Sequence, residues 1–232
     1  MRMSHPPSPR SPRQTLGVIL FVTLALSAVY SLVRVLITPE GAAHGGYANT
    51  RSDYLLMLLQ CVLGLAVFAL PSLLEHKWRL EIPNFIYVMY YVFLYCAIFL
   101  GEVMDFYYLV PHWDTILHFF SGAMLGALGF ILVSVLNDSQ RVPLSLSPGF
   151  VALFSFCFAL SCGAVWEIYE YTFDGLLGLN MQKFVTAAGE TLSGRAALED
   201  TMKDLIVDAC AAAAMSLMGY FRIRKGQKRQ SP

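Results

Sequence analysis

Six long apolar segments, separated by short polar ones, dominate the pattern of this chain. Each has the length of about 20 residues that an α-helix needs to cross the hydrocarbon core of a bilayer. The sequence therefore predicts an all-α integral membrane protein with six transmembrane helices. The expected spans are residues 15–38, 53–74, 84–110, 114–137, 148–173 and 200–221.

The two ends of the chain differ from this apolar pattern. Residues 1–14 are rich in Pro, Ser and Arg, so we expect a disordered cytoplasmic N-terminus. Residues 15–222 form the six-helix transmembrane domain, and residues 223–232 form a basic cytoplasmic tail. The first span follows a basic segment, as the apolar region of a signal peptide does. It is nearly twice as long as such a region, which indicates a retained helix.

Composition and charge support the membrane assignment and give it an orientation. Hydrophobic residues make up 56% of the 232 residues and charged residues only 14%, against roughly 25% charged residues in ordinary soluble domains. Basic residues concentrate at the N-terminus, in the second and fourth loops and in the tail. The positive-inside rule then predicts that both termini are cytoplasmic. We expect the plasma (inner) membrane of a bacterium, with the lipid bilayer as partner and no nucleic-acid partner.

Acidic residues are concentrated at the outward ends of four predicted helices. Charge in or beside the bilayer core costs several kcal/mol per group, so such a concentration indicates a function or a structural pairing. Alternating helix direction brings all four groups to one depth, the extracytoplasmic third of the membrane. Nine of the sixteen acidic residues belong to this set: Glu102, Asp105, Asp114, Glu167, Glu170, Asp174, Asp200, Asp204 and Asp208.

The spacing of these acids places each group on one face of its helix. Glu102 and Asp105 are three residues apart, as are Glu167 and Glu170, while Asp114 and His118 are four apart. Residues three or four apart share a helical face, and a charged face avoids lipid. The sequence therefore predicts that these side chains point into the bundle. Asp200, Asp204 and Asp208 repeat the four-residue spacing on the last helix.

Carboxylates around a single imidazole, that of His118, favour a divalent metal site. Hard cations such as Mg²⁺, Mn²⁺ or Ca²⁺ prefer oxygen ligands, and His118 would also suit Zn²⁺ or Fe²⁺. The candidate metal ligands are Asp114, His118, Glu167, Glu170 and Asp204, and the candidate acid or base groups are His118, Glu167 and Glu170. A metal there could activate water to attack a phosphoryl or acyl group. At this depth the substrate would be a lipid or a lipid-linked intermediate.

Two other interpretations of the same residues stay open. In one, the acids form a polar network that ties helices together, with Arg34 and Lys203 neutralising part of the charge. In the other, they form the vestibule of a cation pathway. The loop of residues 175–199 covers the cluster either as a lid, to which Asn180 and Gln182 would contribute polar groups, or as a disordered surface segment. Gly122 and Gly126 indicate close helix packing.

Four motifs in order carry a resemblance to a known family: WDTILHFFSG (113–122), WEIYE (166–170), GLNMQ (178–182) and DTMKDLIVD (200–208). The chain resembles uncharacterised multi-pass bacterial inner-membrane proteins of the YjdF type over roughly residues 84–222. More distantly, its D-x-x-x-H and D-x-x-x-D patterns resemble VanZ-like proteins of the cell envelope. The resemblance implies a site without naming a reaction. Its motif positions are Asp114, His118, Glu167, Glu170, Asp200, Asp204 and Asp208, and it leaves out Glu102 and Asp105.

The sequence thus favours metal-dependent hydrolysis or transfer on an envelope lipid or lipid-linked substrate. The alternatives are a carrier or binding protein for a cation or small polar solute, and a structural partner of a membrane complex. Neither the metal nor the oligomeric state follows from the pattern.

Overall fold

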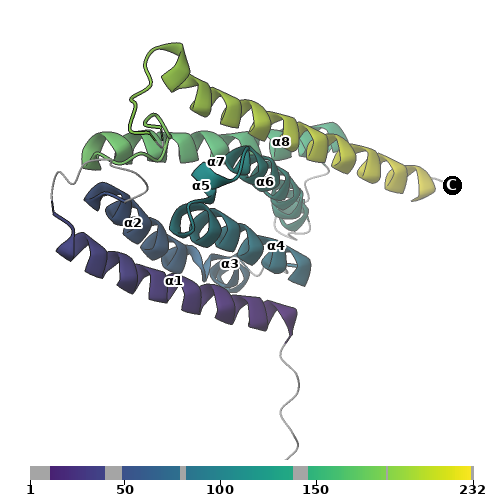
Figure 1. Ribbon diagram of the computed structural model, residues 1–232. Helices are drawn as coiled ribbons and strands as arrows, with labels where there is room; N and C mark the ends of the chain where they lie inside the picture. The colour runs from purple at the N-terminus through teal and green to yellow at the C-terminus, as the bar shows by residue number, and fades with distance from the viewer. Residues whose placement is uncertain (1–10, 40–48, 79–81, 138–145, 187, 231–232) are drawn as a thin grey trace, which may run out of the picture.

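The chain is an all-helical membrane protein, as the apolar pattern predicts (Figure 1). The computed structural model describes residues 11–39, 49–78, 82–137, 146–186 and 188–230. Within these ranges, 6 helical stretches are long and apolar enough to cross a membrane. The elements are α1 (Pro12–Ile37), α2 (Arg51–Val67), α3 (Leu70–Trp78), α4 (Asn84–Leu94), the π-helix η1 (Tyr95–Val103), α5 (Phe106–Leu109), α6 (Trp113–Asn137), α7 (Pro148–Leu177) and α8 (Arg195–Gln230).

The first two long helices begin at capping boxes. The Ser11 side chain accepts a hydrogen bond from the backbone of Gln14, whose side chain accepts from the backbone of Ser11. Thr50 and Asp53 repeat this exchange at the start of α2. Such caps satisfy backbone N–H groups that the first helical turn leaves without partners. Helix α1 therefore starts at Pro12, three residues before the expected span, and the rest of the predicted disordered terminus lies outside the described residues.

A proline interrupts the second span, so α2 and α3 are separate helices. Pro71 has no backbone N–H and cannot donate to the carbonyl of Val67 four residues earlier. The Tyr90 hydroxyl of α4 donates to that carbonyl instead, at 2.8 Å. The break is thus compensated by a neighbouring helix, and it ties the second span to the third.

The third span is shorter than the sequence predicts and changes its geometry before it ends. From Tyr95 to Val103 the backbone forms a π-helix, and at Asp105 it turns with φ of 58°. The chain then folds back as α5. Gly101 makes room for this return, because a Cβ at that position would overlap the ring of Tyr107. Instead of one helix over residues 84–110, the structure therefore has a helix, a sharp turn and a short helix.

The last two spans are longer than expected. Helix α7 continues to Leu177 and ends at Gly178, which has φ of 63°, the left-handed conformation common after a helix. Helix α8 begins at Arg195 and includes residues 223–230 of the expected basic tail. The tail is therefore largely a continuation of the sixth helix, and residues 231–232 lie outside the described part of the chain.

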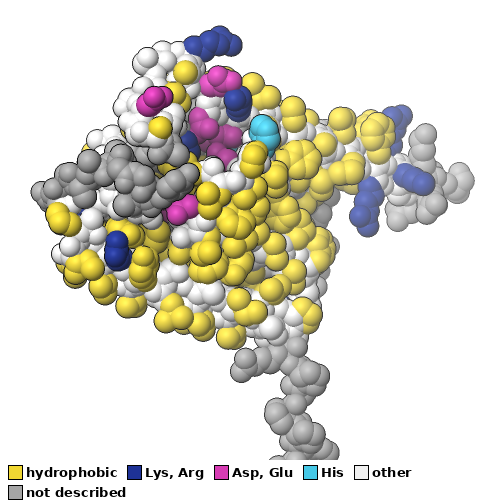
Figure 2. Space-filling model, in the orientation of Figure 1, with side chains coloured by type: hydrophobic (Ala, Val, Ile, Leu, Met, Phe, Trp, Pro, Cys, Tyr) yellow, Lys and Arg dark blue, Asp and Glu magenta, His cyan; other side chains and the backbone are white. Residues whose placement is uncertain are grey.

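The helices form two groups of three with a cavity between them. Helices α1, α2 and α4 pack around a core that includes Leu24, Cys61 and Tyr87. Helices α6, α7 and α8 pack on one another through smaller residues such as Ser155 and Ala211. Figure 2 shows hydrophobic side chains covering most of one flank, whereas acidic side chains gather in a hollow close to the start of α8. This exposed apolar surface suits contact with lipid.

Candidate functional site

The ring of His118 lies at the centre of the acidic cluster. Its Nε2 atom is 3.9 Å from Oδ1 of Asp114, 3.8 Å from Oε1 of Glu167 and 4.0 Å from Oδ2 of Asp204. These three carboxylates come from α6, α7 and α8, so the second group of helices meets at this imidazole. The separations are too long for hydrogen bonds. Ligand atoms about 2.0–2.2 Å from one tetrahedral ion lie about 3.3–3.6 Å apart, so an ion at this place would draw the carboxylates a few tenths of an ångström closer to Nε2.

The other ring nitrogen of His118 faces a fourth carboxylate. Nδ1 lies 3.3 Å from Oδ2 of Asp208, which is only 2% exposed. A carboxylate on one nitrogen of a metal-binding histidine fixes the ring and directs the other nitrogen to the ion. Asp208 is suited to that orienting role, and Nε2 is left facing the other three carboxylates.

Two glycines allow Asp208 to reach this position. A Cβ at Gly163 of α7 would overlap Oδ2 of Asp208, and a Cβ at Gly122 of α6 would lie 3.1 Å from its backbone oxygen. Gly126 continues the small-residue face of α6, where a Cβ would lie 3.0 Å from Cβ of Met215. The prediction that Gly122 and Gly126 allow close packing is therefore confirmed. Their neighbour is α8, which carries Asp204 and Asp208.

Two carboxylate oxygens in the cluster are buried without a hydrogen-bond partner among the described residues. They are Oε1 of Glu167, the atom that faces Nε2 of His118, and Oδ1 of Asp208. Buried polar atoms in folded proteins almost always have a partner, and a missing one indicates an ion, a water or a strained site. The buried Oε1 of Glu167 therefore indicates an ion beside Nε2 of His118, the place that the distances between the ring and the carboxylates also indicate.

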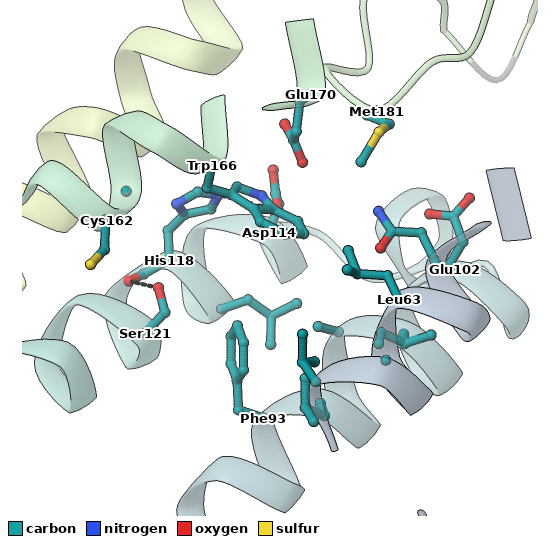
Figure 3. Close-up of a pocket in the computed structure, with 18 of the residues that line it drawn as sticks. Leu63, Phe93, Glu102, Asp114, His118, Ser121, Cys162, Trp166, Glu170 and Met181 are labelled. Carbon is teal, nitrogen blue, oxygen red and sulfur yellow. Dashed lines mark hydrogen bonds and ion pairs between the residues drawn. The ribbon is translucent and has the colours of Figure 1, made fainter. Parts of the chain in front are cut away.

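The cluster opens into a cavity of about 310 Å³ between the two groups of helices. Asp114, His118 and Glu170 line its polar end, and Glu102 from η1 lines the side away from His118 (Figure 3). Glu170 and Asp114 point into it from α7 and α6 (Figure 3). The opposite wall is apolar and includes Leu63 and Phe93 of the first group of helices. One side of the cavity thus suits ions and polar groups, and the other suits hydrocarbon.

The structure separates the remaining predicted residues from His118. Glu102 lines the far side of the cavity and forms an ion pair with Lys183 at 3.6 Å. Asp105 lies at the turn after η1, where its burial and the nearby Asp53 carboxylate raise its pKa. Asp200 is partly buried one turn before Asp204 on α8.

The loop after α7 is an ordered segment in its described part, and three polar residues hold it. Asp174 accepts hydrogen bonds from the backbone N–H groups of Met181 and Gln182, at 2.7 and 3.0 Å. Asn180 bonds both backbone groups of Val185. The side chain of Gln182 donates to Thr201 on α8. Asn180 and Gln182 therefore position the loop, rather than supplying polar groups to the acidic cluster.

The two cations expected to neutralise the cluster lie elsewhere. Arg34 donates to the hydroxyl of Tyr54 at 2.6 Å and lies over its ring. Lys203 pairs with Glu199 on the exposed face of α8, at 2.9 Å. Arg34 and Lys203 therefore do not neutralise the acidic cluster, contrary to the prediction of a polar network that includes them.

Residues that the sequence did not single out complete the cavity. Lys183 and Tyr107 both line it. Burial and the carboxylates of Asp114 and Glu102 raise the pKa of Tyr107 well above its usual value, so its hydroxyl stays protonated as a hydrogen-bond donor. The position of Gly163 was also missed, since a single glycine in an apolar helix carries no spacing signal. The motif GLNMQ (178–182), which directly precedes Lys183, was the sequence signal that could have indicated an ordered loop.

Comparison with known proteins identifies a family of membrane proteins and assigns no reaction to it. Residues 32–225 match a family described as "Predicted membrane protein (DUF2238)". A protein of Thermotoga maritima, described as uncharacterized, is 28% identical over 151 residues, which are 65% of this chain and 69% of that protein. No solved structure matches the chain. These findings agree with the expected multi-pass membrane protein and are consistent with the YjdF-type resemblance, which they do not test.

Proposed function

We propose that this chain, which belongs to the DUF2238 family of predicted membrane proteins, is a metal-dependent enzyme that hydrolyses or transfers a group on an envelope lipid or lipid-linked substrate. The observation that carries the proposal is the position of Nε2 of His118, which faces carboxylates from three helices at 3.8–4.0 Å. The buried Oε1 of Glu167, without a partner among the described residues, supports an ion there.

The proposed ion is divalent and is held by His118, Asp114, Asp204 and Glu167. One ligand atom each from Asp114, His118 and Asp204 can lie within 4.8 Å of one another. A nitrogen ligand together with carboxylates suits Zn²⁺, Fe²⁺ or Mn²⁺ better than Ca²⁺, which prefers a shell of oxygens. Asp208 completes the arrangement as the carboxylate that orients the ring.

The chemistry we infer takes place where the metal site opens into the cavity. Asp114 has a side chain that is 31% exposed, in contrast to the buried Glu167 and Asp204, so the ion would be approached from its side. A divalent ion lowers the pKa of a bound water and polarises a phosphoryl or acyl oxygen. Glu170 points into the cavity and is the candidate proton acceptor.

A lipid or lipid-linked substrate follows from the surroundings of the site. The chain is embedded in a membrane, and the cavity has an apolar wall opposite its polar end. The charge pattern of the loops favours the plasma membrane of a bacterium with both termini in the cytoplasm. In that orientation the polar end of the cavity lies toward the outer surface, beside the head groups.

Metal analysis of the purified full chain tests the proposal. Wild-type protein and an Asp114→Asn/His118→Ala/Glu167→Gln variant are incubated with Zn²⁺, Mn²⁺ or Mg²⁺, freed of excess metal and analysed for bound ion. A Glu199→Gln/Lys203→Gln variant, which changes the exposed pair on α8, is the control. We expect about one ion per chain in the wild type and in the control, and none in the triple variant.

Thermal unfolding gives a second measurement on the same samples. A ligand at about 100 times its dissociation constant stabilises the folded state by about 2.7 kcal/mol, so the metal should raise the unfolding temperature of wild type and control alone. If no divalent ion binds to the wild type, the metal site does not exist. If an ion binds but no lipid substrate is turned over, the carrier or binding alternative is favoured.

A further inference from the structure

The cavity contains an ammonium group, that of Lys183, which is not part of the proposed metal site. Lys183 is the one basic side chain among its described lining residues if His118 is left aside, and it comes from the loop between α7 and α8. Its side chain is only 17% exposed. A buried ammonium group in a cavity of this kind needs a structural or a functional reason.

The contacts of this ammonium group are loose. Nζ of Lys183 lies 3.6 Å from Oε2 of Glu102, and 4.8 and 5.1 Å from the ring centres of Tyr107 and Tyr108. A charge-assisted hydrogen bond between an ammonium and a carboxylate is about 2.7–2.9 Å long. Lysine has three donors, so the group can bind a further acceptor without leaving Glu102.

The loop holds Lys183 in a conformation that an unconstrained lysine rarely adopts. Its φ of 50° is in the left-handed region, which favours glycine, asparagine and aspartate. Asp174 fixes the two preceding backbone N–H groups, and Asn180 closes the loop on Val185. Such a conformation persists only where the surrounding structure imposes it. The backbone at Lys183 is therefore positioned by the fold before any ligand binds, and the side chain extends from this fixed point into the cavity.

Lys183 stays charged in this place. Burial by itself would lower its pKa, but the nearby carboxylate of Glu102, with further contributions from Tyr108, Glu170 and Asp114, raises the pKa above its usual value. The cavity therefore has a permanent cation on one side and the proposed metal site on the other.

We propose that Lys183 binds the phosphate group of the substrate, which is a lipid phosphate whose chain lies against the apolar wall of the cavity. This rests on the proposed function for the metal and adds the class of substrate to it. A phosphate dianion among carboxylates needs cations on more than one side, and pairs of a metal ion and a lysine commonly clamp phosphoryl groups. Tyr107, with its protonated hydroxyl, adds a neutral donor.

The size of the cavity favours one alkyl chain rather than two. Ligand cavities generally measure about 300–1,000 Å³, and this one, at about 310 Å³, is at the lower limit. Leu63 and Phe93 line the side opposite Glu170 (Figure 3). A phosphate at Lys183 would therefore have apolar surface within the same cavity for the first part of a single alkyl chain.

Binding of octyl phosphate to the full-length chain in detergent tests this proposal, with octanol and inorganic phosphate as reference ligands. Each is titrated, with Zn²⁺ present and again without added metal, into wild type and into Lys183→Met, Lys183→Arg, Glu102→Gln and the Glu102→Gln/Lys183→Met double variant. We expect Lys183→Met to lower the affinity for octyl phosphate by about tenfold or more, which corresponds to the loss of one charge-assisted hydrogen bond. The affinity for octanol should not change. Lys183→Arg should retain most of the affinity.

The Glu102→Gln variant keeps Lys183 and gives the sharper prediction. Removing the competing carboxylate should tighten octyl phosphate binding, and the gain should vanish in the double variant. This arm decides the question even if Lys183→Met does not fold. A Lys183→Met protein that is folded and binds octyl phosphate as wild type does would overturn the proposal, as would an equal loss of octanol. Inorganic phosphate binding as tightly as octyl phosphate would overturn the lipid part.

Failure here and failure of the proposed function are distinguishable. Bound metal is measured in every variant, and we expect Lys183→Met to retain it, since Lys183 is not among the residues around Nε2 of His118. Metal binding without any effect of Lys183 on octyl phosphate overturns the present inference and leaves the metal site standing. If octyl phosphate binding depends on Lys183 but the wild type holds no metal, the metal site is overturned and the binding of phosphate by Lys183 stands.

Discussion

Asp208 of α8 and Gly163 of α7 lie so close that the carboxylate occupies the space of a Cβ at position 163. This relationship gives the first prediction. Gly163→Ala should push Asp208 away from Nδ1 of His118 and release the ring, with a loss of about 10- to 100-fold in metal affinity, as for other carboxylates that orient a metal-binding histidine. Isothermal titration with Zn²⁺ or Mn²⁺ measures it.

Helix α7 provides its own control for that substitution. Gly175 lies on the same helix, and a Cβ at that position would meet no described atom within 4 Å, so Gly175→Ala should leave metal affinity unchanged. Equal affinities in the two alanine variants would mean that Asp208 does not orient His118.

The second prediction concerns the break between α2 and α3. Tyr90→Phe removes the donor to the partly buried carbonyl of Val67 and should destabilise the fold by about 0.5–1.5 kcal/mol, the net contribution of a typical hydrogen bond. In a Pro71→Ala background the new backbone N–H can serve that carbonyl, so the same change should have a smaller effect. Thermal unfolding of the four proteins in the cycle measures the coupling. Tyr171→Phe, at a residue that is 71% exposed, is the control.

The third prediction is a pH dependence at Asp105, whose pKa is raised by burial and by Asp53 and lowered in part by Lys183. A carboxyl group with a raised pKa in the folded state stabilises the fold below its unfolded pKa of about 3.9, and this contribution is lost as the pH rises through the folded pKa. Asp105→Asn should therefore raise the unfolding temperature at pH 8 and have little effect at the lowest pH that the protein tolerates. Asparagine also accepts the left-handed backbone at this position.

A gain from Asp105→Asn that is the same at every pH would show that backbone preference, rather than charge, is responsible. A loss at pH 8 would contradict the raised pKa.

The fourth prediction concerns the attachment of the loop that carries Lys183. Asp174→Ala removes both acceptors for the backbone N–H groups of Met181 and Gln182. Hydrogen exchange at these two amides should become faster, and octyl phosphate binding should weaken as it does in Lys183→Met. Metal content should not change. Protection of both amides at the wild-type level would mean that other contacts hold the loop.

The fold could be predicted from the sequence because lipid imposes a simple rule. Apolar segments of sufficient length cross the membrane, and their alternation fixes which ends meet. The meeting of Asp114, His118, Glu167 and Asp204 follows from that alternation and from the four-residue spacing on α6 and α8. Their placement in the structure is a consequence of topology, and their role as ligands remains a prediction.

The parts that could not be predicted depend on local departures from regular helix. Glu102 and Asp105 would share a face in one continuous α-helix, but here Glu102 lies in the π-helix and Asp105 at the left-handed turn that follows it. Lys183 is brought back over the cavity by hydrogen bonds to Asp174, a contact that no periodic pattern encodes. Gly163 matters only because a side chain from another helix fills its place.

The π-helix between Tyr95 and Val103 has a consequence for comparing this chain with others. Residues 95–103 form this π-helix, and a π-helical turn contains about one residue more than an α-helical turn. A relative that had a regular helix here, with both ends facing the same neighbours, would therefore lack one residue at some point in this span. Aligning the two correctly requires a single-residue gap inside a transmembrane helix, where a gap is ordinarily read as an error. Without that gap, Glu102 would be matched to a residue facing in another direction.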